Sequence, residues 1–357
     1  MIKIISPENG YVHCLHTNVH KIFLRRNSAG EHVSEESYGW LSEITDGDLT
    51  HPAFLEICWL SDKESHVEIS LYPDMRDGSD YPNAPVPAEI DHKGSNDGKY
   101  SALIKNMFAG VTYFFRIVSD DGYEESNIYT FSTEGEYPRL IAVDGITNVR
   151  DLGLLPTFNG KRIKQGRIYR GVALESMINN DGYALTVHGK TQMEYLLGIK
   201  NELEIRREAT DKFTESMISS NVGYRQITTR GYEYFIEKPE MVENRRKLIE
   251  FFADENNYPI YFHCAIGADR TGTLAMFLEM LLGVKKEYLN LDYNLTSLTQ
   301  KNLRYNITKQ WLYQKFAECE EGMENDETVM KNCEKFLIET SGVSPETIER
   351  LRRNLLE

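Results

Sequence analysis

Hydrophobic and polar residues alternate in short runs over the first 138 positions of the chain. The runs are rich in aromatic and β-branched side chains, and turn-forming stretches such as Asp77–Asp80 and Ser95–Gly98 separate them. They predict five strands, at residues 54–60, 66–72, 100–105, 111–118 and 127–131. Many short strands at this spacing, without long helical periodicity, are typical of an antiparallel sandwich. We therefore expect an all-β sandwich domain over residues 1–138.

A different pattern begins near residue 139 and continues to residue 357. Its clearest predicted elements are helices at 183–197 and 240–254 and strands at 199–205 and 259–262. The 133–138 segment before the change has the composition of a linker, and charged helical segments over 285–357 are assigned to packing. Strands that alternate with helices predict an α/β domain, with a central, mostly parallel sheet flanked by helices. Ligands are expected beyond the carboxyl ends of its strands.

The loop that follows the 259–262 strand and leads into a helix combines a cysteine with an arginine. Cys264 and Arg270 are separated by five residues, and Gly267 between them allows a tight turn. Backbone N–H groups converge at such a helix N-terminus, the helix dipole favours negative charge there, and arginine can hold two phosphate oxygens. The same positive field stabilises a cysteine thiolate. The alternative is a structural cysteine, but none of the other four cysteines has an arginine six positions later.

The positions of the other loop residues suggest their roles. Asp269 is the only carboxylate inside the loop, which makes it the candidate general acid, and Asp211 ranks second. The Thr271 hydroxyl could hydrogen-bond the sulfur of Cys264, and His263 is assigned to orienting the loop. Phosphate oxygens are expected to bind the backbone along the loop, at Ala265, Ile266, Gly267 and Ala268.

The segment His263–Gly272 resembles the signature loop of cysteine-dependent protein tyrosine phosphatases. It is most similar to the bacterial tyrosine/lipid phosphatase branch, whose loop has the form His-Cys-x-x-Gly-Lys-Asp-Arg-Thr-Gly. Three further segments resemble that branch, namely Gly145–Gly153, Gly166–Gly171 and Ser344–Leu351. The resemblance implies hydrolysis of phosphomonoesters through a phosphocysteine, without a cofactor or a metal. Ala268 stands where the branch often has lysine, which favours protein over lipid substrates.

Residues outside the loop could complete the site. Asn148, Arg150 and Asp151 could brace the loop through a buried polar network or contact substrate directly, and the sequence leaves both readings open. Arg206 and Arg207 follow the 199–205 strand at its carboxyl end, so one of them could bind substrate. The tyrosine-rich stretch 224–234 could form a wall of the pocket for an aryl phosphate or a surface excursion.

Composition and charge narrow the function further. A formal net charge of −15 argues against nucleic acid or an anionic membrane as partner, because both require a basic face. Five cysteines without paired spacing indicate a reducing compartment, and neither a signal peptide nor a membrane span is recognisable, so we expect a cytoplasmic protein. The segment His13–His16 is an incomplete metal-ligand set, which favours an exposed strand or loop over a metal site.

The N-terminal domain also has a weaker resemblance of its own. Met107–Arg116, followed by Tyr129–Thr133, resembles the end of a fibronectin type III domain, in which Tyr113 would make a corner contact. This domain is expected to bind a protein partner or flank the pocket and to supply no catalytic group. The leading function is a phosphotyrosine or dual-specificity phosphatase. The alternatives are a phosphoinositide or inositol-phosphate phosphatase and a non-catalytic phospho-binding module.

Overall fold

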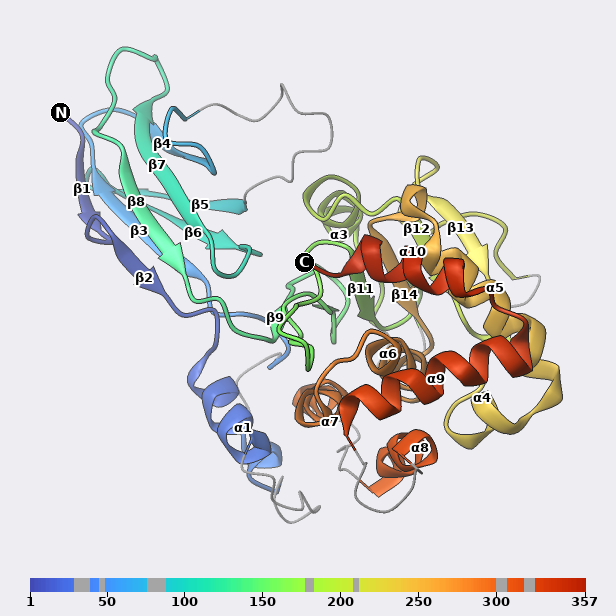
Figure 1. Cartoon of the computed structure of the whole chain (residues 1–357). Coiled ribbons are helices and arrows are strands. Elements are labelled where there is room, and N and C mark those ends of the chain that lie inside the picture. The colour runs from blue at the N-terminus through green and yellow to red at the C-terminus, as the bar shows by residue number, and fades with distance from the viewer. Residues whose placement is uncertain are drawn as a thin grey trace.

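The computed structural model describes residues 1–28, 39–44, 49–75, 88–176, 183–207, 212–299, 307–317 and 325–357. Figure 1 shows a sheet-rich N-terminal region beside a C-terminal region that holds most of the helices. Two sequence expectations, the turn at 77–80 and the second-ranked acid Asp211, fall outside the described residues.

The N-terminal region contains two four-stranded sheets. The first has the order β1 (Lys3–Ser6), β3 (Leu55–Leu60), β6 (Lys99–Lys105), β5 (Glu89–Asn96), and all its pairs are antiparallel. The second has the order β2 (Tyr11–His13), β8 (Tyr129–Thr133), β7 (Thr112–Ser119), β4 (Ser65–Ser70), with β2 parallel to β8. Alternate residues of β3 and β7 are buried, which is the period-two pattern that predicted them. All five predicted strands are confirmed.

The region is not all-β, because residues before β3 form a helix. Helix α1 (Asn18–Ser28) is followed by the 3₁₀-helix η1 (Gly39–Glu43). Within α1 only His20 and Phe23 are fully buried, so the apolar period is too sparse to signal a helix. The helix packs against α7 (Lys286–Asn294), where the Asn294 side chain donates a hydrogen bond to Asn27 at 3.0 Å. Tertiary contact rather than local pattern stabilises it.

Of two smaller expectations for this region, one is confirmed and one is wrong. The Tyr113 hydroxyl accepts a hydrogen bond from the N–H of Phe108 at 2.7 Å, which is the predicted corner contact. The expected exposure of the His13–His16 segment is wrong for its two histidines. Both are buried, because a ring nitrogen of each contacts a backbone carbonyl, at 3.1 and 2.8 Å. The part of the chain that the structure describes contains no group of three or more residues able to hold a metal ion.

The C-terminal region is built on one six-stranded sheet. Its order is β13 (Gly223–Gln226), β12 (Asn201–Glu204), β14 (Ile260–His263), β11 (Ile168–Gly171), β10 (Arg150–Asp151), β9 (Arg139–Leu140). The first four strands are parallel, and β10 and β9 are antiparallel to their neighbours. The predicted mostly parallel sheet is therefore confirmed, with β14 near its centre.

Helices and short turns surround this sheet. They are α3 (Val187–Thr191), the π-helical η3 (Gln192–Leu196), α4 (Glu233–Glu237), η5 (Pro239–Met241), α5 (Val242–Ala253), η6 (Glu255–Asn257), α6 (Asp269–Leu281), η7 (Leu295–Thr299), α8 (Ile307–Ala317), α9 (Asp326–Ser341) and α10 (Pro345–Leu355). Ile260 and Phe262 of β14 belong to the large core cluster that includes side chains of α5 and α6. Tyr261, which points to the opposite face, packs in a second cluster with Met193 of η3. Both faces of the sheet are thus covered. None of the helices in the described ranges is long and apolar enough to cross a membrane.

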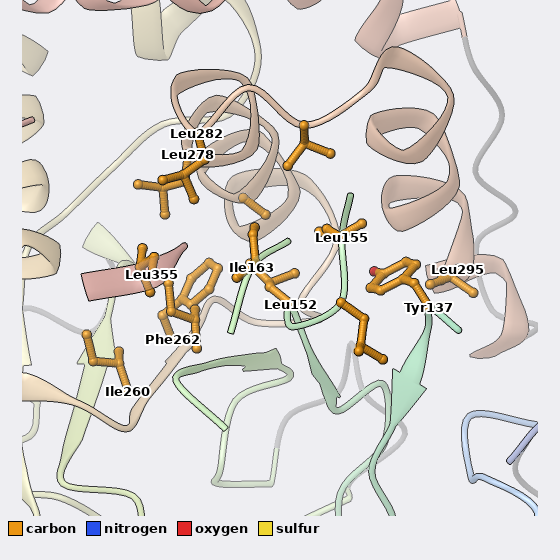
Figure 2. Close-up of a cluster of buried hydrophobic side chains, with 14 of the residues drawn as sticks. Tyr137, Leu152, Leu155, Ile163, Ile260, Phe262, Leu278, Leu282, Leu295 and Leu355 are labelled. Carbon is orange, nitrogen blue, oxygen red and sulfur yellow. The ribbon is translucent and has the colours of Figure 1, made fainter. Parts of the chain in front are cut away.

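The junction between the two regions is buried rather than exposed. Tyr137 lies in the same core cluster as Leu152, Leu155 and Leu295, and Figure 2 shows it among these side chains. Arg139 is 2% exposed and donates to the carbonyls of Met107 and Asn106 at 3.0 and 3.1 Å. The segment predicted as a linker therefore connects two regions that share one hydrophobic core.

Candidate active site

The loop between β14 and α6 lies at the carboxyl end of a fully buried central strand. Cys264 directly follows this strand and is 2% exposed. Gly267 has a φ of +67°, and a Cβ there would lie 2.4 Å from the carbonyl oxygen of Gly171, so only glycine fits. Ala268 is the N-cap of α6 and offers no side-chain oxygen to the first amides of the helix. The N-terminus of α6 is therefore not capped by its own N-cap residue.

Three consecutive carbonyl groups of the loop are held by hydrogen bonds. The Ala265 carbonyl accepts from the N–H of Ala173 at 3.0 Å. The Ile266 carbonyl accepts from Asn148 Nδ2 at 3.1 Å, and the Gly267 carbonyl accepts from Arg170 Nη2 at 2.8 Å. Because a peptide unit is planar and trans, each bond also directs the following N–H to the opposite side. The N–H groups of Ile266, Gly267 and Ala268 donate no hydrogen bond to another described residue.

This arrangement can bind an anion beside a cysteine, and we call the N–H groups of Ile266, Gly267 and Ala268 the cradle. All three come just before the start of α6, where the helix dipole adds positive potential. Arg270 is the second residue of α6 and is half-buried. The cradle is suited to three oxygens of a tetrahedral phosphoryl group, with the sulfur of Cys264 as the nearest nucleophile in the loop.

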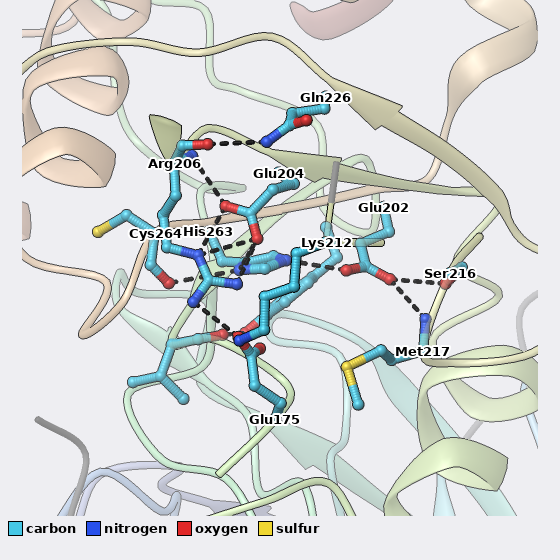
Figure 3. A network of polar contacts seen from close by, with 12 residues as sticks. Glu175, Glu202, Glu204, Arg206, Lys212, Ser216, Met217, Gln226, His263 and Cys264 are labelled. Atoms are coloured by element: carbon cyan, nitrogen blue, oxygen red, sulfur yellow. Dashed lines mark hydrogen bonds and ion pairs between the residues drawn. The ribbon is translucent and has the colours of Figure 1, made fainter. Parts of the chain in front are cut away.

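His263 is part of a buried ionic network behind the loop, shown in Figure 3. Its Nε2 contacts Glu202 Oε1 at 3.0 Å, and its Nδ1 lies 3.3 Å from the Cys264 carbonyl oxygen. Burial opposes the charged imidazolium, but the charge of Glu204 and the hydrogen bond to Glu202 outweigh it and raise the pKa of His263 to about 9. His263 is therefore a cation fixed by two carboxylates, which supports the expected role in orienting the loop.

The buried pair predicts how stability depends on pH. A folded-state pKa of about 9, above the ordinary 6.5, contributes about 3 kcal/mol that is fully present below pH 6.5 and is lost as the pH rises through about 9. Chemical unfolding of the full chain at several pH values should show this loss. In His263→Gln the slope should flatten, whereas the exposed His66→Gln should retain it. Equal slopes in the wild type and His263→Gln would contradict the assignment.

Arg206 is engaged by protein carboxylates. Its side chain is 2% exposed, its Nε contacts Glu204 at 2.9 Å, and its Nη1 pairs with Glu175 at 2.8 Å (Figure 3). These contacts place Arg206 in the network that holds His263, so direct substrate binding by this side chain has no support in the structure. Arg207 is exposed just after β12, and its predicted contact with substrate stays a prediction.

The segment Gly145–Gly153 contributes to the site in two ways. Asn148 and Arg150, which are 2% and 1% exposed, belong to the network that holds the loop carbonyls. Asp151 instead pairs with Arg139 at 2.8 Å and accepts the N–H groups of Gly153 and Gly166, so it stabilises the junction. Burial of all three favours bracing over direct contact with substrate.

Asp269 is held by a tyrosine from the predicted 224–234 stretch. The Tyr232 hydroxyl donates a hydrogen bond to Asp269 Oδ1, and the Tyr232 N–H donates to Thr273 Oγ1 at 2.9 Å. Burial raises the pKa of Tyr232 well above its ordinary value, so the hydroxyl keeps its proton. Tyr232 has a φ of +58°, unusual for a tyrosine, and strain of this kind accumulates at functional sites. One side of the 224–234 stretch thus reaches the loop.

The predicted hydrogen bond from Thr271 to the cysteine is not made. Thr271 is fully buried in the first turn of α6, and its Oγ1 has no hydrogen-bond partner among the described residues. Two residues that lie behind the loop, Arg170 and Asp292, were not predicted from the sequence. Arg170 lies inside a segment that resembles the family, whereas Asp292 lies in a helix assigned to packing, and its sequence context carries no signal.

Comparison with known proteins agrees with this geometry. A family model described as "Tyrosine phosphatase family" matches residues 141–357, which is more than half of the chain. The chain belongs to the tyrosine phosphatase family. The expectation of a phosphatase is confirmed at the level of the family, and the matched range coincides with the region that contains the loop.

Individual relatives are distant. A Cupriavidus necator protein, named as a candidate tyrosine-protein phosphatase, is 23% identical over 193 residues, which span 47% of this chain and 66%, just under two thirds, of that protein. The core catalytic domain of the PP-IP phosphatase SIW14 from S. cerevisiae aligns with 16% identity and a TM-score of 0.30, covering 51% of this chain and 94% of that structure. The BIgI domain of the S. agalactiae beta protein, solved bound to CEACAM1, aligns with 17% identity and a TM-score of 0.18, covering 38% of this chain and all of that structure. TM-scores this low do not establish a shared fold.

Proposed function

We propose that the chain hydrolyses phosphomonoesters through a phosphocysteine and that its substrates are phosphotyrosine residues in proteins. The observation that carries this proposal is the cradle of three amides, those of Ile266, Gly267 and Ala268, next to Cys264. Membership of the tyrosine phosphatase family supports the same chemistry. The acidic net charge of −15 makes this local positive cradle the natural place for an anionic substrate.

The reaction has two steps. In the first, the Cys264 thiolate attacks phosphorus in line, the S–P bond forms, and the P–O bond to the tyrosyl oxygen breaks while that oxygen takes a proton from Asp269. The loop amides and the Arg270 guanidinium stabilise the charge on the three equatorial oxygens. In the second, Asp269 accepts a proton from water as the water oxygen attacks phosphorus. The S–P bond then breaks and releases inorganic phosphate and the thiolate.

The substrate class is tested by comparing kcat/KM for different kinds of substrate. We expect the full chain to hydrolyse a phosphotyrosyl peptide with a kcat/KM at least about tenfold above that for an inositol polyphosphate or a phosphoinositide in vesicles. The reason is that Ala268 adds no cation for further phosphates at the loop. EDTA should not reduce turnover, since the loop and Arg270 supply the positive charge. A higher kcat/KM for the inositol compounds would show that the substrates are inositol phosphates or phosphoinositides instead. If neither kind of substrate is hydrolysed, the result would favour a non-catalytic phospho-binding module.

For the N-terminal region we propose an immunoglobulin-like sandwich that binds a protein partner. Its orders β1-β3-β6-β5 and β2-β8-β7-β4 match the A-B-E-D and G-F-C arrangements of that fold, with β2 as an added strand. Tyr113, near the start of the strand equivalent to F, makes the corner hydrogen bond typical of such domains. A crystal structure should show the two sheets packed face to face, with strand directions about 30° apart. Orthogonal sheets would contradict this proposal.

We also propose that the protein is located in the cytoplasm.

A further inference from the structure

We propose that Asp292 of α7 is a positioning residue for the phosphate-binding loop and that Tyr137 ties the N-terminal region to it. The inference rests on the proposed function only in taking the loop as the phosphate site. Five residues form what we call the Asp292 cluster: Asp292, Tyr137, Asn148, Arg150 and Arg170. Arg170 lies in β11, beside the loop. The other four residues lie outside the loop and outside β11, β14 and α6.

Asp292 is the centre of this cluster. Its side chain is 2% exposed, and its Oδ1 accepts hydrogen bonds from Arg150 Nε at 2.8 Å and from the Tyr137 hydroxyl at 2.6 Å. Its Oδ2 pairs with Arg170 Nη1, and its backbone carbonyl accepts from Arg150 Nη2 at 2.8 Å. Burial opposes ionisation, but Arg150 and Arg170 hold the pKa of Asp292 well below its usual range. One buried carboxylate therefore pairs with two buried guanidinium groups and orients both.

The two arginines carry this orientation to the loop. Arg170 uses its other terminal nitrogen, Nη2, to donate to the Gly267 carbonyl at 2.8 Å. Arg150 Nη1 donates to Asn148 Oδ1 at 2.7 Å, and Asn148 Nδ2 donates to the Ile266 carbonyl at 3.1 Å. Asp292 thus acts on two adjacent peptide groups by two separate routes.

Fixing these two carbonyls fixes the groups that bind phosphate. The planar peptide that carries the Ile266 carbonyl also carries the N–H of Gly267, and the next one carries the N–H of Ala268. Both N–H groups belong to the cradle of three amides. If Asp292 were lost, the like-charged Arg150 and Arg170 would lose their shared partner, and the carbonyls they hold would be free to rotate. The cradle should then bind an anion more weakly even in a protein that stays folded.

The N-terminal region contributes two groups to this arrangement. Tyr137, next to β9, supplies the hydroxyl on Asp292, and Thr50 Oγ1 accepts the N–H of Asn148 at 3.0 Å. Asn148 has a φ of +59°, a left-handed conformation that asparagine tolerates, and the contact with Thr50 holds its backbone in place. From the sequence, the N-terminal region was expected to bind a partner or flank the pocket and to supply no catalytic group. The contacts of Tyr137 and Thr50 make it part of the support for the loop.

The test measures the affinity of the full chain for inorganic phosphate by calorimetry, beside kcat, KM and thermal stability. Asp292→Asn should raise the Kd for phosphate at least about tenfold and raise KM for an aryl phosphate. Arg170→Lys keeps the charge but loses the two nitrogens that contact Asp292 and the Gly267 carbonyl together, so it should raise the Kd by a similar factor. Tyr137→Phe, which removes only the hydroxyl, should raise it about threefold.

Two matched controls separate positioning from folding. Leu289→Val in the same helix removes a buried methylene and should lower Tm without changing the Kd. Tyr288→Phe changes the ring that packs edge-on against Tyr137, 6.5 Å between centroids, and should leave the Kd unchanged.

Wild-type phosphate affinity in folded Asp292→Asn overturns the proposal. If Asp292→Asn does not fold, wild-type affinity in Arg170→Lys overturns it. Phosphate binding is read independently of turnover, so a chain that binds phosphate but hydrolyses no phosphotyrosine would sink only the proposed function.

Discussion

Cys264→Ser in the full-length chain is expected to reduce kcat/KM for a phosphotyrosyl peptide by at least about 10⁴-fold. A serine hydroxyl is a far weaker nucleophile at neutral pH than a thiolate. Both ring nitrogens of the adjacent His263 contact other groups, so this histidine does not activate the hydroxyl. The cradle amides belong to the backbone and are unchanged by the substitution. The Kd for inorganic phosphate should therefore stay within about threefold of the wild type. Steady-state kinetics and calorimetry measure the two effects on the same preparation.

A matched control and a covalent readout sharpen this result. Cys58 lies in β3 of the N-terminal region, and Cys58→Ser should leave kcat/KM unchanged. Rapid acid quench of the wild type with substrate should trap one phosphoryl group on Cys264, detected by mass spectrometry of the peptide that contains it. Substantial turnover by Cys264→Ser, or a phosphoryl group on another residue, would remove the proposed mechanism.

The loop was predictable because its chemistry is local in sequence. Cys264, Gly267 and Arg270 lie within seven consecutive positions, and the strand and helix on either side carry clear apolar patterns. The parallel sheet was predictable for a similar reason, since buried strands such as 199–205 stand out between amphipathic helices. Such features depend on neighbours in the chain, which a single sequence displays.

The groups that hold the loop were not predictable from the same evidence. Asp292 lies 28 positions after Cys264 in a polar helix, where an aspartate ordinarily faces solvent. Glu202 and Glu204 lie in the predicted 199–205 strand, and they are buried only because His263 and Arg206 lie opposite them. Arg206 was expected at the substrate for its position at a strand end, yet these carboxylates engage it. Long-range pairing of buried charges leaves no periodic trace in the sequence.

The shared core of the two regions was missed for a related reason. Thr133–Pro138 has the composition of a linker, but Tyr137 is 6% exposed because its ring packs in the core and its hydroxyl reaches Asp292. A tyrosine in a short polar segment does not reveal whether it is buried. The consequence is functional, since a contact between regions becomes part of the support for the catalytic loop.

Asp269→Asn is expected to lower kcat/KM for a phosphotyrosyl peptide by about 10²–10⁴-fold. The tyrosyl oxygen is a poor leaving group unless it is protonated, and Asp269 is the carboxylate of the loop, next to the cradle and held by the Tyr232 hydroxyl. Para-nitrophenyl phosphate, whose leaving group departs without help, should lose much less. The measurement is the ratio of the two losses in the same variant.

This ratio distinguishes an acid from a structural residue. Asparagine keeps the size of Asp269 and can still accept the Tyr232 hydroxyl, so the first turn of α6 should remain intact. The exposed Asp120→Asn in the N-terminal region serves as control and should change neither substrate's kcat/KM. A larger loss of kcat/KM for the phosphotyrosyl peptide than for para-nitrophenyl phosphate would identify Asp269 as the group that protonates the leaving oxygen. Equal losses for both substrates would mean that the carboxylate maintains the loop through Tyr232 and that the proton comes from elsewhere.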